Sequence, residues 1–299
     1  MQQSGEHFDP SIQICNPSEN ERWNVADLWQ ESFNDSPEYI EFFFNRVYKP
    51  ENTFVIKRNG FIVSAVQMIP YKAKFRNEIL PVAYICGACT HPFERGKGLM
   101  QLLMHHVKSE MIRRGFPIAI VIPAEPSLFN FYRRFGFNQL FFQRVEYLGY
   151  NKFSVNSLES RYHLTFEACT LEHFQYFNRK QHALTKTILH DASEFETILQ
   201  ELNCDGGKSY VALENQLPVG IASAERLSKD TTLVKVFFAD SERICTALCK
   251  YAFRLFEARH IKIYSSNHSS KNQLNYGLAC NLDNKKREFI RFRVSLMHD

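Results

Sequence analysis

The stretch from His91 to Met100 carries the residues whose types and spacing point most clearly to chemistry. It follows an apolar run that predicts a strand, and it opens a long helical pattern. A glycine-rich turn between a strand and a helix leaves several backbone N–H groups unbonded at the positive end of the helix dipole. Gly96 and Gly98 permit the close approach of an anion, and Arg95 and Lys97 add positive charge. The turn therefore predicts a site for a phosphate or pyrophosphate, on any phosphorylated cofactor.

Two common nucleotide-binding motifs do not fit this turn. No Gly-Lys-Ser/Thr follows a four-residue spacer, and Gln101 stands where a G-x-G-x-x-G motif needs its third glycine. The alternative interpretation of the segment is an ordinary basic start of a helix.

A second segment, Phe129–Phe137, places Tyr132 on the next expected helix. Taken alone, this tyrosine is most simply a packing residue.

The elements that must position these segments follow from the hydrophobic periodicity. Asn59-Gly60 predicts a hairpin turn. The expected helices cover residues 21–33, 36–48, 95–114 and 127–135, and the expected strands cover residues 53–57, 61–70, 71–76, 82–90, 117–123 and 137–150. This order predicts an α/β protein with a mixed sheet and a βαβ centre.

The second half of the sequence repeats this order in weaker form. Residues 209–220 align without gaps onto residues 53–64, and each segment gives a strand, a polar turn with Asn and a second strand. A strand over 233–239, a helix over 243–258, a strand over 260–265 and a last helix over 271–280 complete the copy. We therefore expect two tandem domains, residues 1–150 and 151–299, joined near residues 151–165.

Together the two chemical segments resemble the signature of the GNAT superfamily of N-acetyltransferases. That signature is R-x-x-G-x-(small) after a strand and then Y-x-x-x-G-F, here Arg95-Gly96-Lys97-Gly98-Leu99-Met100 and Tyr132-Arg133-Arg134-Phe135-Gly136-Phe137. Met100 replaces the usual small residue, which is compatible with phosphate binding through the backbone. The resemblance implies two GNAT-like domains, the first catalytic, and transfer of an acetyl group from acetyl-CoA to a small-molecule or peptide amine.

The resemblance also implies roles by position. In such proteins the fourth and fifth strands splay apart and hold the pantetheine arm, so the backbone of Ala88, Cys89 and Thr90 is expected to pair with it. The N–H groups of the turn are expected to hold the pyrophosphate, and Ser127 to contact the cofactor; the turn residues are Arg95, Gly96, Lys97, Gly98, Leu99 and Met100. Tyr132 is expected to protonate the leaving thiolate after direct attack by a neutral amine.

The sequence does not decide which residues bind the acceptor amine or which group acts as the general base. Tyr84 and Cys86 share one face of the expected fourth strand and could line the acceptor site. Glu38, with Asp35 and Glu41, surrounds the turn between the first two helices, which is a usual acceptor-binding region of the fold. Each of these carboxylates is alternatively a solvated group at a helix start. Water could also remove the proton.

More narrowly, the doubled arrangement, Ser127 and the ending of the tyrosine motif resemble the enhanced-intracellular-survival acetyltransferases. Those proteins carry a third, sterol-carrier-like domain, and their terminal carboxylate serves as the base. Because the sequence ends at Asp299 with the second copy, we expect no third domain and transfer no such role to Asp299. The aminoglycoside specificity of that family is not inherited either.

The second copy lacks the glycine turn. Ala239–Cys245 replaces it, with acids where a phosphate would lie, so we expect no CoA binding there but a wall of the acceptor site or a contact in a homo-oligomer. The basic residues near the end, Lys285–Arg287 with Arg291 and Arg293, are interpreted as a solvated turn and strand edge.

Composition limits the remaining classes of function. With 44% hydrophobic and 23% charged residues the chain is expected to fold, and a net charge of +4 is too small to indicate nucleic acid. Its apolar runs are of strand length and no leader is recognised, so we expect a cytoplasmic protein without membrane spans. The eight cysteines are expected to be reduced. In Cys86-Gly-Ala-Cys89 the two thiols should point to opposite faces of a strand, so we expect no metal.

Two other functions remain beside the leading one. A CoA-binding or scaffold protein without turnover would not need Tyr132. An aminoacyl transferase of the peptidoglycan-bridge type also uses paired GNAT-like domains, but such proteins do not bind CoA, and the glycine turn of the first copy argues against them.

Overall fold

The computed structural model describes residues 11–149, 164–204, 206–265, 273–289 and 292–294. These residues form two compact units. Unit 1 contains the described parts of Met1–Pro70, Pro81–Asn138 and Cys280–Lys286, and unit 2 contains the described parts of Tyr71–Leu80, Gln139–Ala279 and Arg287–Asp299. The expected join near residues 151–165 lies almost wholly outside the described residues, so the division at residue 150 stays a prediction.

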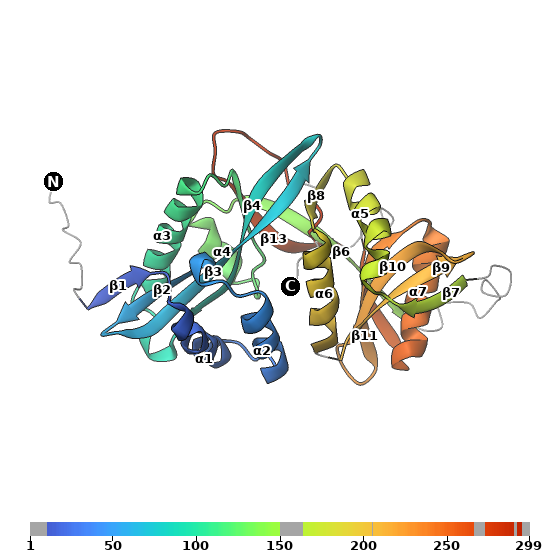
Figure 1. Cartoon of the computed structure of the whole chain (residues 1–299), viewed down its shortest axis with the longest axis horizontal. Coiled ribbons are helices and arrows are strands. Elements are labelled where there is room, and N and C mark those ends of the chain that lie inside the picture. Colours follow the sequence, from blue (N-terminus) through green and yellow to red (C-terminus); the bar gives the residue numbers. More distant parts are fainter. Residues whose placement is uncertain (1–10, 150–163, 205, 266–272, 290–291, 295–299) are drawn as a thin grey trace. The chain divides into compact units, whose positions relative to one another are not determined.

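Unit 1 is built on a mixed sheet with the strand order β1-β2-β3-β4-β5 (Figure 1). Strands β1, β2 and β3 pair antiparallel, whereas β4 and β5 pair parallel with α3 between them in the chain. The predicted βαβ centre is therefore confirmed. The bounds are β1 Ile12–Cys15, α1 Arg22–Ser32, α2 Pro37–Arg46, β2 Thr53–Arg58, β3 Phe61–Phe75, β4 Glu78–Thr90, α3 Leu99–Arg113, β5 Ile118–Val121 and α4 Leu128–Arg133.

Neighbouring residues of β2 show that helices cover both faces of this sheet. Val55 packs in an apolar cluster with Trp29 of α1 and Phe43 of α2. Phe54 points to the opposite face, because successive strand residues alternate, and its ring lies 5.7 Å from that of His106 in α3. Val55 and Phe54 are almost completely buried, and burial of a side chain of this size contributes about 1.5–3 kcal/mol.

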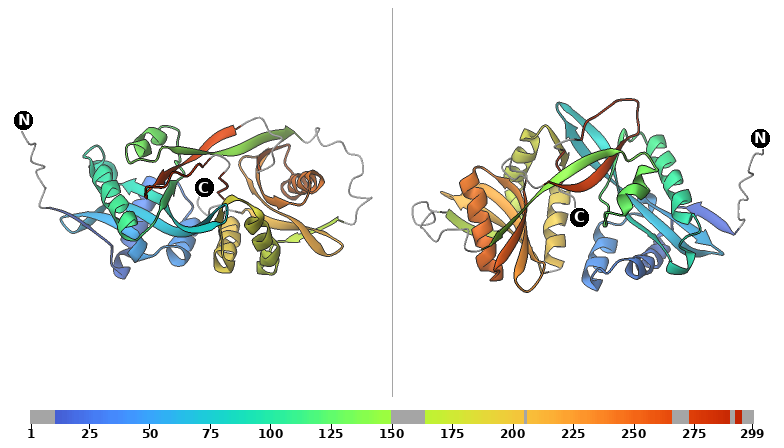
Figure 2. Two further views of the ribbon diagram at one scale, coloured as in Figure 1. Left: turned by 90° about the horizontal axis from the view of Figure 1, so that it is seen from above. Right: turned by 180° about the vertical axis from the view of Figure 1, so that it is seen from behind.

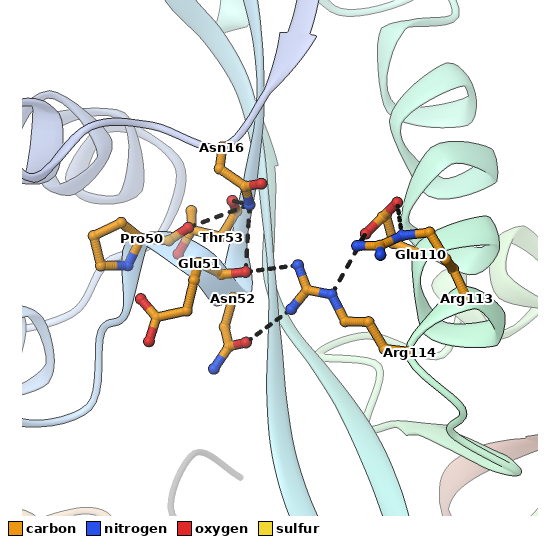
Figure 3. Close-up of polar contacts among 8 residues, drawn as sticks. All are labelled: Asn16, Pro50, Glu51, Asn52, Thr53, Glu110, Arg113 and Arg114. Carbon is orange, nitrogen blue, oxygen red and sulfur yellow. Dashed lines mark hydrogen bonds and ion pairs between the residues drawn. The ribbon is translucent and has the colours of Figure 1, made fainter.

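Polar contacts hold the C-terminal end of α3 against the start of β2 (Figure 3). Arg114 donates from Nη1 to Oδ1 of Asn52 at 3.1 Å and from Nη2 to the carbonyl oxygen of Glu51 at 2.8 Å. Its Nε reaches Glu110 of the same helix at 3.4 Å. The side-chain amide of Asn16 donates to three carbonyl oxygens in the same segment before and at the start of β2. These contacts fix one end of α3, so its other end has a defined place beside β4.

Strand β3 is longer than predicted. It runs unbroken from Phe61 to Phe75, where two strands were expected over residues 61–70 and 71–76. The last residue of β3 that pairs with β2 is Gln67. Pro70 lies beyond it, so its missing N–H breaks no bond of that ladder.

Unit 2 repeats the order of elements found in unit 1. Its strands follow the order β13-β6-β12-β11-β10-β9-β7, with β9, β10 and β11 antiparallel and β11 and β12 parallel around α7. Both views in Figure 2 show β6 (green) and β13 (red) side by side. The outer end of β3 pairs with β8. The bounds are β6 Gln139–Gly149, β7 Leu164–Ala168, α5 Phe174–Ala183, β8 Lys186–Leu189, α6 Ala192–Cys204, β9 Lys208–Glu214, β10 Leu217–Arg226, β11 Thr231–Ala239, α7 Glu242–Phe256, β12 His260–Ser265 and β13 Gln273–Asn281.

The turns and faces of unit 2 also match those of unit 1. Asn59-Gly60 and Asn215-Gln216 both have positive φ at the two central residues, as two-residue hairpins require. The predicted alignment of these two hairpins is confirmed. Val234 of β11 packs with α7, whereas Phe237 points to the other face and contacts Phe177 of α5.

The helix predicted over residues 271–280 is wrong in its described part. Gln273–Asn281 forms strand β13, which pairs antiparallel with β6. The apolar pattern is too short to distinguish a helix from a strand, and pairing with a distant strand decides the outcome. Leu278 and Ala279 are completely buried in this strand.

Candidate active site

Two glycines shape the turn between β4 and α3. Gly96 and Gly98 have φ of +79° and +78°, and a Cβ on either would meet no atom within 4 Å. This left-handed conformation cannot continue into a right-handed helix. The helix therefore begins at Leu99, not at residue 95 as predicted.

The backbone donors of this turn are unused. Leu102 is the first residue whose N–H bonds into α3, to the carbonyl oxygen of Gly98 at 3.0 Å. In the described ranges no carbonyl or side chain accepts from the N–H groups of residues 96–101. A row of unbonded donors at the positive end of a helix fits phosphate oxygens.

The charged side chains beside the turn are partly engaged with their neighbours. Arg95 donates from Nε to the carbonyl oxygen of Thr90 at 2.9 Å, which ties the turn to the end of β4. Glu94 forms ion pairs with Arg58 at 2.6 Å and with Lys97 at 3.1 Å. Arg95 thus has a positioning role in addition to the positive charge that the sequence indicated.

Strand β4 extends further along the chain than its pairing with the parallel strand β5. The pairing between them ends at Ile85 opposite Val121, where β5 stops, whereas β4 continues to Thr90. The segment from Cys86 to Thr90 therefore has no β5 partner, and it contains the expected pantetheine-binding residues Ala88, Cys89 and Thr90. An extended ligand can use such an open strand edge for main-chain hydrogen bonds.

A bulge-like kink at Gly87 interrupts this segment. Its φ is +58°, which breaks the alternation of side chains along β4. Cys86 and Cys89 both pack against the cluster formed with α1 and α2, so the expectation that they point to opposite faces is wrong. Both cysteines are unbridged.

Tyr132 of α4 lies beside the same part of β4. Its side chain is buried and its ring contacts that of Phe137, with centroids 6.1 Å apart. Burial raises the pKa of the phenol well above its ordinary value, and Cys86 and Cys89 add to the rise. The hydroxyl forms no hydrogen bond to the described residues. The group is therefore a protonated phenol next to the open end of β4.

The remaining predicted residues occupy different environments. Tyr84 is 1% exposed and lies opposite Ile120, where β4 is still paired with β5. Glu38 lies exposed in the first turn of α2, and Ser127 lies exposed before α4, where Oγ contacts Glu125 at 3.3 Å. The structure thus brings Cys86 and Tyr132 together and leaves Tyr84 in the core.

Sequence reasoning missed the contact between α1 and the kink in β4. A Cβ on Gly87 would lie 2.3 Å from the indole of Trp29, so the ring rests directly on this glycine. The Nε1 group of Trp29 donates to Oδ2 of Asp35 at 2.7 Å. A glycine inside a strand pattern is a known signal of a bulge or of a close neighbour, and it was available in the sequence.

The corresponding region of unit 2 is arranged differently. Ser241 caps α7 by accepting from the N–H of Ile244 at 3.3 Å, which uses one of the donors that are free in α3. Asp240, directly before it, accepts from the hydroxyl of Tyr176 at 2.6 Å and pairs with Lys180 at 2.6 Å. A carboxylate thus lies where the first unit has its glycine turn.

Arg293 lies beside the part of β11 that extends past its pairing with β12. That pairing ends at Lys235, and Arg293 donates to the carbonyl oxygen of the next residue, Val236, at 3.3 Å. Its guanidinium lies 4.5 Å from the ring of Phe238, and burial lowers its pKa to about 10. The interpretation of Arg293 as a solvated residue is therefore wrong, and Arg291 lies outside the described residues.

Two further properties concern the described part of the chain as a whole. No three His, Cys, Asp or Glu side chains in it are grouped so that they could hold a metal ion. None of its helices is both long and apolar enough to cross a membrane.

An open strand edge, a turn with unbonded N–H groups and a buried phenol thus lie together at the end of β4. Residues 13–140 match the family model described as an acetyltransferase (GNAT) domain. This part of the chain is similar to the acetyltransferase domain of the GNAT enzymes. Such enzymes use acyl-CoA and act on small-molecule or peptide amines.

Solved structures share the fold over nearly the whole chain. A GCN5-related N-acetyltransferase from Anabaena variabilis matches 91% of this chain and 73% of its own, at 16% identity and a TM-score of 0.70. Eis1 from Mycobacterium abscessus matches 91% and 74%, at 13% identity and a TM-score of 0.65. The N-myristoyltransferase of Saccharomyces cerevisiae, solved with myristoyl-CoA, matches 92% and 83%, at 13% identity and a TM-score of 0.60. A comparison with curated proteins gave no match.

Proposed function

We propose that this protein transfers an acetyl group from acetyl-CoA to an amine by direct attack, within residues 1–150, and that residues 151–299 are not catalytic. One observation carries the proposal: the end of β4, whose edge toward β5 has no strand partner, leads directly into the turn with unbonded N–H groups. An extended carrier with a pyrophosphate at one end requires these two features in this order. The match of residues 13–140 to an acetyltransferase domain supports it.

The backbone supplies most of the cofactor contacts in this proposal. The N–H groups of the turn bind the pyrophosphate, and Arg95 and Lys97 add positive charge beside it. The main chain of Ala88, Cys89 and Thr90 binds the pantetheine arm, and one N–H polarises the thioester carbonyl. Ser127 lies exposed at the start of α4, where its hydroxyl is accessible to the cofactor. The bound acyl-CoA supplies an activated acyl group on a thiolate leaving group.

Tyr132 acts as the general acid. Because its pKa is raised, the phenol stays protonated at neutral and mildly alkaline pH and has a proton for the departing thiolate. Its hydroxyl has no described partner that would compete for this proton. Cys86 and Glu38 are assigned to the acceptor side, whereas burial leaves Tyr84 only a supporting role behind the site.

Replacement of Tyr132 by Phe tests this assignment. The variant keeps the aromatic packing and removes the proton donor, so kcat should fall about 100-fold while acetyl-CoA still binds. The measurement is formation of CoA and acetylated amine, separated by chromatography and identified by mass, with a fixed panel of primary amines. Tyr251→Phe, a matched change inside unit 2, should leave the rate unchanged. Equal rates for Tyr132→Phe and the parent protein would contradict the acid role.

The length of the acyl chain is tested with the same assay. Acetyl-CoA and myristoyl-CoA are offered at equal concentration, and we expect faster transfer from acetyl-CoA. Preference for myristoyl-CoA would retain the acyltransferase and contradict the acetyl assignment.

A further inference from the structure

The main chain of Arg293 is held at a fixed place in unit 2. Its N–H donates to the carbonyl oxygen of Lys186 at 3.1 Å, and its own carbonyl oxygen accepts from the N–H of Ile188 at 3.0 Å, so the residue lies against β8. Phe292 and Val294, on either side of it, are almost completely buried. Because side chains alternate along an extended chain, the side chain of Arg293 points away from these two, and it reaches β11.

The guanidinium of Arg293 has little to neutralise it. Its Nη2 donates to the carbonyl oxygen of Val236 at 3.3 Å, and its carbon lies 4.5 Å from the ring centroid of Phe238. In the part of the chain that the structure describes, no carboxylate pairs with this group, and its Nε and Nη1 donate no hydrogen bond. Asp240, the acid directly after β11, pairs with Lys180 instead, at 2.6 Å.

These surroundings are unfavourable for a lone positive charge. Burial lowers the pKa of Arg293 to about 10, so the group is still charged at neutral pH. Transfer of an unpaired ion from water into a protein costs several kcal/mol, and a single bond to a carbonyl oxygen offsets only part of that cost. Part of the side chain is exposed, so a dissolved anion can reach it. An anion that accepts from Nε and Nη1 supplies both the missing charge and the missing hydrogen bonds.

The same surroundings indicate which anion fits. A carboxylate presents two oxygens in the geometry of the guanidinium fork. Its single negative charge balances a single cation, whereas a phosphate dianion brings a second charge that no neighbour of Arg293 neutralises. The ring of Phe238, over which the guanidinium lies, contacts the ring of Phe177 at 5.3 Å, so the border of the site is apolar. An acid with an apolar group therefore fits better than a small hydrated anion.

Space for such a group lies along β11. The pairing of β11 with β12 ends at Lys235, and β11 continues to Ala239. On this side the last residues of β11 have no strand partner within the described ranges, and Arg293 reaches the first of them, Val236. The guanidinium is thus bound to the edge of β11 where its pairing stops.

We propose that unit 2 binds a monocarboxylate with an aromatic or alkyl group, and that Arg293 holds its two oxygens. The apolar part of the ligand lies along the ring of Phe238, beside the open edge of β11. Arg293, Val236, Phe238 and Phe177 all belong to unit 2, so this site is not the acyl-CoA site proposed for unit 1. The inference therefore does not depend on the proposed function.

Calorimetric titration with sodium phenylacetate and with phenylacetamide, in a buffer free of carboxylates, tests this inference. The two molecules are similar in size and shape, and only phenylacetate is an anion at neutral pH. We expect the parent protein to bind phenylacetate at least about tenfold more tightly than phenylacetamide. Inorganic phosphate, the third probe, should bind more weakly than phenylacetate.

Substitutions of Arg293 assign the preference to this side chain. Arg293→Gln keeps hydrogen-bond donors and removes the charge, so the preference for phenylacetate over phenylacetamide should be lost. Arg293→Lys keeps the charge without the fork, so it should retain only part of the preference. Arg259→Gln, the same loss of charge at an exposed position of unit 2, should bind phenylacetate as the parent does.

Thermal unfolding distinguishes a ligand site from a structural role. A ligand that binds the native state raises the Tm as its concentration rises. Phenylacetate should therefore raise the Tm of the parent protein and leave that of Arg293→Gln unchanged. If Arg293 only ties its own segment to β11, Arg293→Gln lowers the Tm and phenylacetate changes the Tm of neither protein, which would overturn the inference.

The other outcomes are equally distinct. Equal affinity of the parent for phenylacetate and phenylacetamide, tighter binding of phosphate, or an Arg293→Gln variant with the parent's preference would each contradict the assignment of a monocarboxylate to Arg293. A protein that binds phenylacetate through Arg293 but does not bind acetyl-CoA would keep this site and overturn the proposed function.

Discussion

At the scale of single residues, the site depends on a few side chains in unusual surroundings. Tyr132 is a phenol kept in its acid form by burial. Gly87 is a glycine because both its positive φ and the indole of Trp29 exclude a side chain. Asp35 is a carboxylate with one oxygen fixed by the indole N–H of Trp29. The properties of each residue depend on its surroundings, so conservative substitutions at these positions test the role of each side chain.

Gly87→Ala should be strongly destabilising. The new methyl group would meet the indole at 2.3 Å, and the positive φ disfavours any side chain. We expect a loss of about 2 kcal/mol or more in the free energy of unfolding, measured by urea denaturation. Gly115→Ala also changes a glycine of positive φ but meets no atom, and it should cost only about 1 kcal/mol. Equal losses of unfolding free energy in the two variants would contradict this prediction, because they would show that the indole of Trp29 moves away from the new methyl group without loss of stability.

At the scale of elements, the two ends of α3 differ in their chemistry. Its N-terminal end begins after Gly98 and keeps its donors free for a ligand. Its C-terminal end is tied by Arg114 to Asn52 and to the backbone before β2 (Figure 3). Glu110 joins this end through Arg113 and Arg114.

Glu110→Gln should weaken unit 1 in a pH-dependent way. Hydrogen bonds from Arg113, with a smaller share from Arg114, lower the pKa of Glu110 from 4.5 to about 2. A lowered carboxyl pKa stabilises the fold above pH 4.5, and this contribution is lost as the pH falls toward 2. The variant should lose roughly 0.5–1 kcal/mol at pH 7 and low salt. Urea titrations from pH 7 to pH 2 should show the difference shrinking, and a difference independent of pH would contradict the prediction.

The features set by local sequence could be predicted, and those set by distant contacts could not. The hairpin at Asn59-Gly60 and the turn at Gly96 and Gly98 follow from backbone preferences of the residues themselves. Strand β13 was missed because its partner β6 lies far away in the sequence.

The same limit applies to the site. Tyr132 and the turn were identified from motif spacing and lie beside the end of β4. The Trp29–Gly87 contact joins α1 to β4. The glycine inside the strand pattern indicates a close neighbour, but no local pattern identifies that neighbour as Trp29. Tyr84 was placed in the acceptor region from its strand face alone, which does not show that the residue is buried against β5.

At the scale of the whole molecule, the same unit of two parallel strands joined by a helix occurs twice, as β4-α3-β5 and as β11-α7-β12. The two copies differ at the end of the first strand and in the turn before the helix. In unit 1 the segment from Cys86 to Thr90 has no strand partner on its β5 side, and the turn after it keeps its backbone donors unbonded. In unit 2 the equivalent places are occupied by the chain itself, with Arg293 at β11 and Asp240 before α7. We therefore propose that each chain binds a single CoA, in unit 1.

Calorimetric titration with acetyl-CoA tests this central claim most directly. We predict one binding site per chain, with affinity reduced about tenfold or more in Arg95→Glu, because the substitution places a negative charge beside the pyrophosphate. Lys49→Glu, the same reversal of charge at an exposed position of unit 1, should bind as the parent does. No binding by the folded protein, two sites per chain, or unchanged affinity in Arg95→Glu would contradict the account.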